Sequence, residues 1–108
     1  MDESQYNLRV GKAFKSLLTA LDEADPDQVD AESTGDMITI TSATREKCVV
    51  NTQRAVSQIW VAGKSQGIHF SYDDASGEWR DDKGKGLELF AFVADCVEAI
   101  SGIRLRLP

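Results

Sequence analysis

The sequence predicts an α+β fold, a two-layer sandwich in which two helices pack on one face of an antiparallel β-sheet. Helical periodicity occurs near each end of the chain, and segments of alternating apolar and polar residues fill the middle. The connections between those segments are too short for the crossover helices that parallel strands require. With 108 residues, 42% of them hydrophobic, the chain suits one domain, spanning 1–108, that buries an ordinary core.

The first helix is predicted over 4–21, where apolar residues recur at steps of three and four. The stripe consists of Tyr6, Val10, Phe14, Leu17, Leu18 and Leu21. We expect Ser4 to cap its N-terminus, and Pro26 to end it because proline cannot continue a helix. Polar and basic residues occupy the remaining faces, so a single face is directed to the core.

An acidic segment, 22–32, follows this helix and leads into a first strand. Between Lys15 and Arg45 there is no lysine or arginine, and seven acids lie in that gap: Asp22, Glu23, Asp25, Asp27, Asp30, Glu32 and Asp36. Acids at a helix C-terminus face the negative end of the helix dipole, so helix stability does not explain Asp22 and Glu23. Clustered carboxylates can bind hard cations through oxygen, although the EF-hand pattern fails here. The alternative to a cation site is a solvated acidic rim that aids solubility.

Short strands succeed one another in the middle of the chain, with polar turns between them. The strands are predicted over 37–41, 47–51, 58–62 and 67–72, and around Trp79. The turns are predicted at 33–35, 52–57 and 73–77. Consecutive strands joined by such short turns pair with one another, which makes the sheet an antiparallel meander.

The segment 58–62 places a tryptophan opposite the apolar face of its strand. Ile59 and Val61 take the core face, which leaves Trp60 on the other. With both helices on one side of the sheet, the open face should carry Asn51, Trp60 and His69. A large ring on a polar face indicates a contact surface. The alternatives are a loop or helix that covers the ring, or a bulge that reverses the alternation.

A second helix is predicted over 87–101, with a broad apolar face and a glycine after its last residue. That face consists of Leu89, Phe90, Val93, Cys96, Val97 and Ile100. Gly102 is the expected C-cap. In the tail, 103–108, two leucines alternate with two arginines, and we expect this segment to lie against the helices.

Charge and composition exclude several classes of function. The net charge of −6 and the scattered basic residues argue against nucleic acid, since phosphate binding needs a concentrated basic face. The acidic N-terminus differs from a signal or transit peptide, and no apolar run approaches the roughly 20 residues that span a bilayer. We therefore expect a cytosolic chain with no membrane partner.

Chemistry-bearing side chains are few. Cys48 and Cys96 lie far apart without a CxxC motif, and we expect reduced core thiols in preference to a disulfide or a thiolate metal site. His69 is the sole histidine, which excludes a His-rich metal site, and no nucleophile motif adjoins it. The residues alone therefore predict an acidic binding module and not an enzyme.

Four motifs follow one another along the predicted strands. They are Val49-Val50-Asn51-Thr52-Gln53, Gln58-Ile59-Trp60-Val61-Ala62, Gly67-Ile68-His69-Phe70 and Glu78-Trp79. Each motif alone is weak, but their order and spacing resemble the frataxin family, specifically its bacterial CyaY branch. The resemblance extends from the first helix to Gly102, and it implies a single frataxin-like domain with the sandwich predicted above.

The resemblance implies an iron-binding protein of iron–sulfur cluster assembly, acting as an iron donor or chaperone or as a regulator of the cysteine desulfurase–scaffold complex. Iron, as Fe²⁺ or Fe³⁺, would be weakly bound, and other divalent cations would be accepted. The implied metal ligands are Asp22, Glu23, Asp25, Asp27, Asp30 and Glu32, with Glu3 as a further candidate. The implied contacts with cysteine desulfurase and the scaffold protein are Asn51, Gln53, Trp60 and His69.

The resemblance also implies a monomer, with iron-driven oligomers left open, in the bacterial cytoplasm or, for a mature eukaryotic form, in the mitochondrial matrix. Two alternative functions remain at this point. The chain can be a pure protein–protein modulator of the desulfurase with incidental metal binding. It can also be a ferroxidase, although a di-iron site usually needs Glu-x-x-His ligands that this chain lacks.

One departure from the family pattern narrows the expected iron site. Where relatives often carry acids or a histidine along the exposed side of the first helix, this chain has Asn7, Arg9, Lys12 and Lys15. We therefore expect the site at the C-terminal end of that helix.

Overall fold

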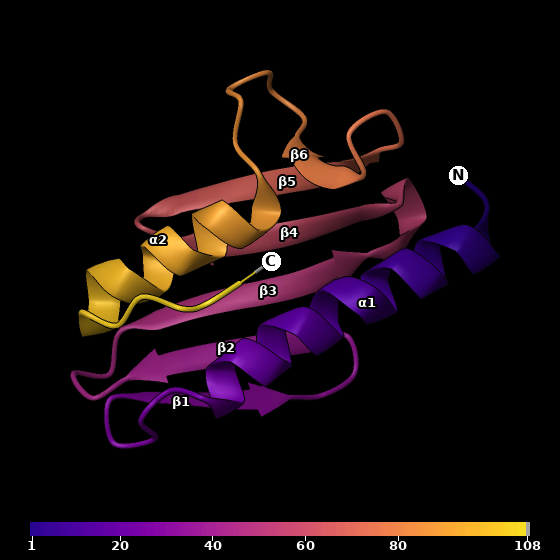
Figure 1. Ribbon diagram of the computed structural model, residues 1–108. Helices are drawn as coiled ribbons and strands as arrows, with labels where there is room; N and C mark the ends of the chain where they lie inside the picture. The colour runs from indigo at the N-terminus through magenta and orange to yellow at the C-terminus, as the bar shows by residue number, and fades with distance from the viewer. Residues whose placement is uncertain (108) are drawn as a thin grey trace.

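The computed structural model describes residues 1–107, so Pro108 of the predicted tail lies outside the described residues. Within them, α1 (Glu3–Asp22) and α2 (Leu89–Ser101) lie on one face of a single six-stranded antiparallel sheet, as Figure 1 shows. The strands, paired in sequence order, are β1 (Val29–Ser33), β2 (Met37–Ser42), β3 (Lys47–Gln53), β4 (Gln58–Gly63), β5 (Gln66–Asp73) and β6 (Glu78–Asp81). The predicted sandwich and meander are both confirmed.

The first helix buries the predicted stripe except Leu18, which is half-buried against the core, and the helix begins earlier than expected. Its buried residues are Tyr6, Val10, Ala13, Phe14, Leu17, Ala20 and Leu21. The prediction of Ser4 as N-cap was wrong, because Asp2 accepts the N–H of Gln5 at 2.8 Å while the Gln5 side chain accepts the N–H of Asp2 at 3.4 Å. This reciprocal capping box satisfies two free N–H donors. The helix ends at Asp22, so Pro26 bars an extension but does not set the end.

Strand alternation places the apolar residues in one layer between the sheet and the helices. Ile38, Ile40, Val50, Ile59 and Val61 are all 0% exposed and share one core cluster with residues of both helices. The predicted strands are confirmed, with small differences at their ends. The largest is in β3, which continues through Gln53, so that a 3-10 turn, η1 (Arg54–Val56), takes up the rest of the predicted turn.

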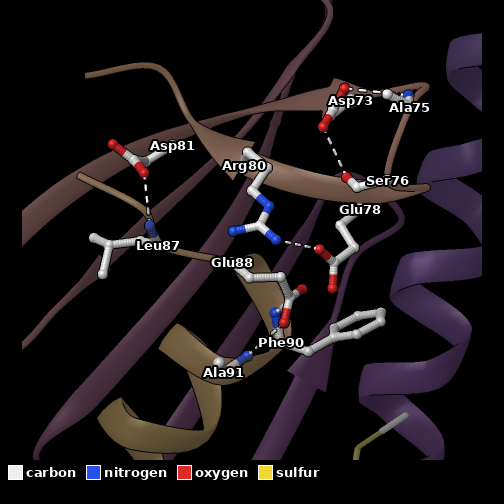
Figure 2. A network of polar contacts seen from close by, with 10 residues as sticks. All are labelled: Asp73, Ala75, Ser76, Glu78, Arg80, Asp81, Leu87, Glu88, Phe90 and Ala91. Atoms are coloured by element: carbon white, nitrogen blue, oxygen red, sulfur yellow. Dashed lines mark hydrogen bonds and ion pairs between the residues drawn. The ribbon is translucent and has the colours of Figure 1, made fainter. Parts of the chain in front are cut away.

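One carboxylate organises the loop between β6 and α2. Asp81, 9% exposed, accepts the backbone N–H groups of Lys85 and Leu87, both at 2.7 Å, and of Lys83 at 3.2 Å. Figure 2 shows the bond to Leu87. These bonds hold the pKa of Asp81 below its ordinary value, with the Lys85 N–H as the largest cause. A charged group therefore fixes the backbone of this loop, and Leu87 at its end packs against the core.

The second helix begins two residues later than predicted because Glu88 serves as its N-cap. The Glu88 carboxylate accepts the N–H groups of Phe90 at 2.8 Å and Ala91 at 3.1 Å (Figure 2). Gly102, with φ of 76°, closes the helix as predicted and donates its N–H to the carbonyl of Glu98.

The tail beyond α2 packs on the core, as predicted. Leu105 is buried, and Ile103 and Leu107 are half-buried against the same cluster. In Figure 1 this segment runs back between the two helices. The tail therefore completes the helical layer and leaves the opposite sheet face uncovered.

Candidate functional site

Three residues predicted for the open sheet face lie in one row across three strands. In the register, Trp60 of β4 is directly opposite Asn51 of β3 and His69 of β5. Their strand neighbours Val50, Val61 and Ile68 are buried on the helical side. Because successive side chains alternate between faces, the row of Asn51, Trp60 and His69 must lie on the side away from the helices. This placement was predicted and is confirmed.

The indole of Trp60 rests across the neighbouring strand and is half-buried there. Its ring centroid lies 6.0 Å from that of His69, with 32° between the ring planes. A β-carbon built on Gly67 would lie 3.0 Å from Trp60 Nε1, so the missing side chain at residue 67 makes room for the indole. The ring is thus held flat over β5 with part of its surface in solvent.

Gln53 lies two residues beyond Asn51 on the same face of β3, opposite Gln58 of β4. The Gln58 amide donates hydrogen bonds to Ser71 Oγ at 2.9 Å and to Asp82 Oδ2 at 3.2 Å. We name the four residues Asn51, Gln53, Trp60 and His69 the open-face patch. It combines an aromatic anchor with amide and imidazole groups, which is the composition of a protein-contact surface.

All seven predicted metal ligands are exposed, but they are not gathered at one point. Asp22 ends α1 and Glu23 is its C-cap. Asp25 starts the turn that follows, since its carboxylate accepts the N–H of Asp27 at 2.9 Å. Glu3 lies at the opposite end of α1, roughly 28 Å away along a helix of this length. The structure therefore separates Glu3 from the other six.

The other six acids form what we name the acidic edge: Asp22, Glu23, Asp25, Asp27, Asp30 and Glu32. Asp27, Asp30 and Glu32 line a hollow of about 570 Å³ at the β1 edge of the sheet, and Arg45 and Lys47 line it too. Glu23 lines a second hollow, of about 380 Å³, with Arg104 and Arg106 of the tail.

The basic side chains in these two hollows lower the attraction for a cation. Asp22 and Asp25 line neither hollow, and the last turn of α1 itself carries no basic residue. The negative end of the helix dipole adds to the field of the carboxylates there. The acidic edge therefore favours cations most strongly around Asp22 and Asp25.

Within residues 1–107, no three His, Cys, Asp or Glu side chains come together in a way that could hold a metal ion. A cation bound at the acidic edge would keep most of its water ligands. Such binding is weak and selects poorly among hard cations.

Asp36 belongs to the acidic gap in the sequence, but the structure gives it a separate role. Arg54 donates to Asp36 Oδ1 at 2.6 Å and to Asn7 Oδ1 at 2.5 Å, which ties η1 to the β1–β2 turn and to α1. The hydrogen bond from Arg54 lowers the pKa of Asp36. The partners are distant in the chain, so the sequence carried no local signal for this link.

The two cysteines, which lie far apart in the sequence, were expected to be reduced core thiols. Both are buried, as predicted, but their side chains meet between β3 and α2 and share a hydrogen bond. The sequence distance between them concealed this contact, because it depends on where α2 crosses the sheet.

The described residues contain no helix whose length and hydropathy would allow it to cross a membrane. A family model described as a frataxin-like domain matches residues 1–103. The iron–sulfur cluster assembly protein CyaY of Paraburkholderia xenovorans is 38% identical over 95 residues, covering 88% of this chain and 87% of that protein.

The protein of the same name from Delftia acidovorans is 41% identical over 85 residues, covering 79% of this chain and 74% of that protein. Among solved structures, frataxin from Psychromonas ingrahamii superposes with a TM-score of 0.85 at 23% identity, covering 97% of this chain and 96% of that one. This structural likeness shows the same fold, and the matched family model extends over nearly the whole described chain. The chain therefore belongs to the frataxin family, as a bacterial CyaY-type frataxin.

Proposed function

We propose that this chain acts in iron–sulfur cluster assembly as a binding protein without catalytic activity. It docks on the cysteine desulfurase–scaffold complex through the open-face patch and holds iron loosely at the acidic edge. The observation that carries the proposal is the row of Asn51, Trp60 and His69, aligned across three adjacent strands on the face that the helices leave open. Relatives that carry the name iron–sulfur cluster assembly protein support the assignment of this chain to that process.

The open-face patch and the β1 part of the acidic edge suit a single partner because they lie on the same face of the sheet. Asp30 and Glu32 alternate with the core-facing Val29 and Ala31 of β1, so they lie on the same sheet face as the open-face patch. Three strand spacings, about 14 Å, separate β1 from β4. A partner with a basic surface beside an aromatic-binding pocket would contact both at once.

Iron is the cargo in this proposal and not a resident cofactor. Carboxylate oxygens suit Fe²⁺ and Fe³⁺ as hard ligands, and an open edge without an enclosing cage allows transfer to a second protein. The exposed positions of Asp22 and Asp25, beside the negative end of the α1 dipole, support the acidic edge as the entry point.

A second candidate function is a modulator of the desulfurase for which metal binding is incidental. The dispersed arrangement of the acids favours it, since no three of the possible ligands within residues 1–107 enclose an ion. A ferroxidase has less support. His69 lies on β5, four strand spacings or about 19 Å from the acids of β1, so it would not share a metal ion with them. Because the relatives are bacterial, we propose that the chain acts in the bacterial cytoplasm.

A titration of ¹⁵N-labelled protein with Fe²⁺ under anaerobic conditions, repeated with Co²⁺, tests the iron proposal. We expect the amide signals of residues 22–27 to shift or broaden first, and those of 30–32 at higher metal. The Asp22→Asn/Asp25→Asn variant should lose the early response. Glu3→Gln, at the far end of α1, is the matched control and should keep it. A first response centred on His69 would contradict the proposal.

A further inference from the structure

A pair of buried cysteines joins the sheet to the second helix. Cys48 on β3 and Cys96 on α2 are both 0% exposed. A β-carbon built on Gly63 would lie 2.8 Å from the Sγ of Cys96 and 3.3 Å from the Sγ of Cys48. The two sulfur atoms therefore border the same small space, which stays free for them because residue 63 has no side chain.

The two thiols have different environments. The Cys48 thiol donates a hydrogen bond to the sulfur of Cys96, and this bond raises the pKa of Cys48, to which burial adds. The same hydrogen bond lowers the pKa of Cys96, and the positive charge of Lys64 lowers it further. Cys96 is therefore the thiol that more readily becomes a thiolate, the form that reacts with oxidants. Cys48 is the protonated partner beside it.

The pair lies close to the surface although both residues are buried. Gly63 is the last residue of β4, and the turn after it, Lys64 and Ser65, is exposed with positive φ at both positions. Figure 1 shows the C-terminal half of α2 at the same end of the sheet as this β4–β5 turn. A small neutral oxidant would reach the sulfurs through local opening of the turn, without unfolding of the sheet.

We propose that Cys48 and Cys96 are a redox-active dithiol that hydrogen peroxide converts into an intramolecular disulfide between β3 and α2. The Cys96 thiolate attacks one peroxide oxygen, so an S–O bond forms and the O–O bond breaks. The departing hydroxide becomes water with the proton that Cys96 lost. The sulfur of Cys48 then attacks the sulfenic acid of Cys96, so the S–S bond forms and the S–O bond breaks. The hydroxyl leaves as a second water with the proton of Cys48, and two electrons have passed from the thiols to the peroxide.

This modification is independent of the metal and partner surfaces. The sulfurs lie on the helical side of the sheet, opposite the open-face patch. The disulfide closes the loop from residue 48 to residue 96 and restricts the unfolded chain. Native disulfides typically lower the equilibrium constant for unfolding by roughly 30- to 1,000-fold. The oxidised protein should therefore show a higher urea midpoint than the reduced protein.

Treatment of the folded wild-type protein with hydrogen peroxide, followed by alkylation in denaturant and mass spectrometry, tests the proposal. We expect the intact mass to fall by two hydrogens, one linked peptide pair to contain Cys48 and Cys96, and dithiothreitol to reverse both changes. Cys48→Ser should instead accumulate a sulfenic acid at Cys96 that dimedone traps. A mass gain of oxygen without a cross-link in the wild type would overturn the proposal, as would a disulfide-linked dimer. The wild-type result decides the matter even where a serine variant fails to fold.

Discussion

Trp60 on β4 and His69 on β5 are directly opposed in the sheet register, and their ring centroids lie 6.0 Å apart on the face that the helices leave open. The pairing of β4 with β3 and with β5 continues without a bulge through residue 60. The ring is therefore on the open face because of regular alternation, and its partial burial comes from neighbours on that same face. Neither a covering loop nor a reversed strand is needed to explain it.

Truncation of Trp60 should cost far less stability than truncation of its strand neighbour. Trp60→Ala loses partial packing on His69, worth about 1 kcal/mol. Ile59→Ala, at a position with 0% exposure, opens a core cavity and should cost about 2–5 kcal/mol. Urea unfolding of both variants measures the difference. Equal losses would mean that the indole belongs to the core.

Gly67→Ala should displace the indole of Trp60 without unfolding the protein. The new methyl group would lie 3.0 Å from Nε1 and 3.3 Å from Cζ2 of Trp60, and the ring can move outward because Trp60 is only half-buried. We expect the fluorescence emission of Trp60 to shift to longer wavelength.

Gly11→Ala is the matched control, since nothing lies within 4 Å of a β-carbon there. It should leave the emission unchanged and stabilise α1 by about 1 kcal/mol. An unchanged spectrum for Gly67→Ala would mean that the indole does not rest on β5.

Asp81→Asn should make stability less dependent on pH. The folded-state pKa of Asp81 is lowered by the backbone N–H groups it accepts, with that of Lys85 first, so its contribution is present above the unfolded-state pKa, about 4. It is lost as the pH falls through the lower folded-state value. The variant should be less stable at pH 7, and its deficit should shrink towards pH 2 in urea titrations. Asp82→Asn, one residue away and exposed, controls for loss of a charge. Parallel pH curves for wild type and Asp81→Asn would contradict this account.

Neutralising the end of α1 should stabilise the fold while weakening cation binding. The triple variant Asp22→Asn/Glu23→Gln/Asp25→Asn removes crowded like charges and an unfavourable interaction with the helix dipole. We expect the melting temperature to rise by a few degrees at low salt and the gain to shrink in 1 M NaCl, where such interactions are screened. A lower melting temperature would show that these carboxylates support the fold.

Periodicity was sufficient to predict the elements that position the site. The stripe of α1, the alternation of β2 to β5 and Gly102 at the end of α2 are local patterns, and the structure keeps all of them. The open face of Trp60 followed from those patterns together with the placement of both helices on one side. The wrong prediction of the N-cap of α1 concerned a local pattern too, because Asp2 and Gln5 form a capping box that the sequence already displays.

Contacts that depend on how elements cross each other were not predictable. Cys48 and Cys96 meet because α2 lies over the start of β3, and no pattern in the sequence gives that offset. Arg54 reaches both Asn7 and Asp36 only after η1 has folded beside α1. The separation of Glu3 from the other acids follows from the length of α1, and the sharing of one hollow by Asp30 and Lys47 follows from strand register.

The affinity of cysteine desulfurase for this chain, measured by titration calorimetry with and without Fe²⁺, tests the central claim most directly. Trp60→Ala should weaken binding by about 30-fold, as expected for an aromatic anchor worth about 2 kcal/mol. Leu8→Ala, which removes a 61%-exposed side chain from the helical face, should bind like the wild type. Wild-type affinity in a folded Trp60→Ala variant, or a loss of binding in Leu8→Ala, would contradict the assignment of the open-face patch as the docking surface.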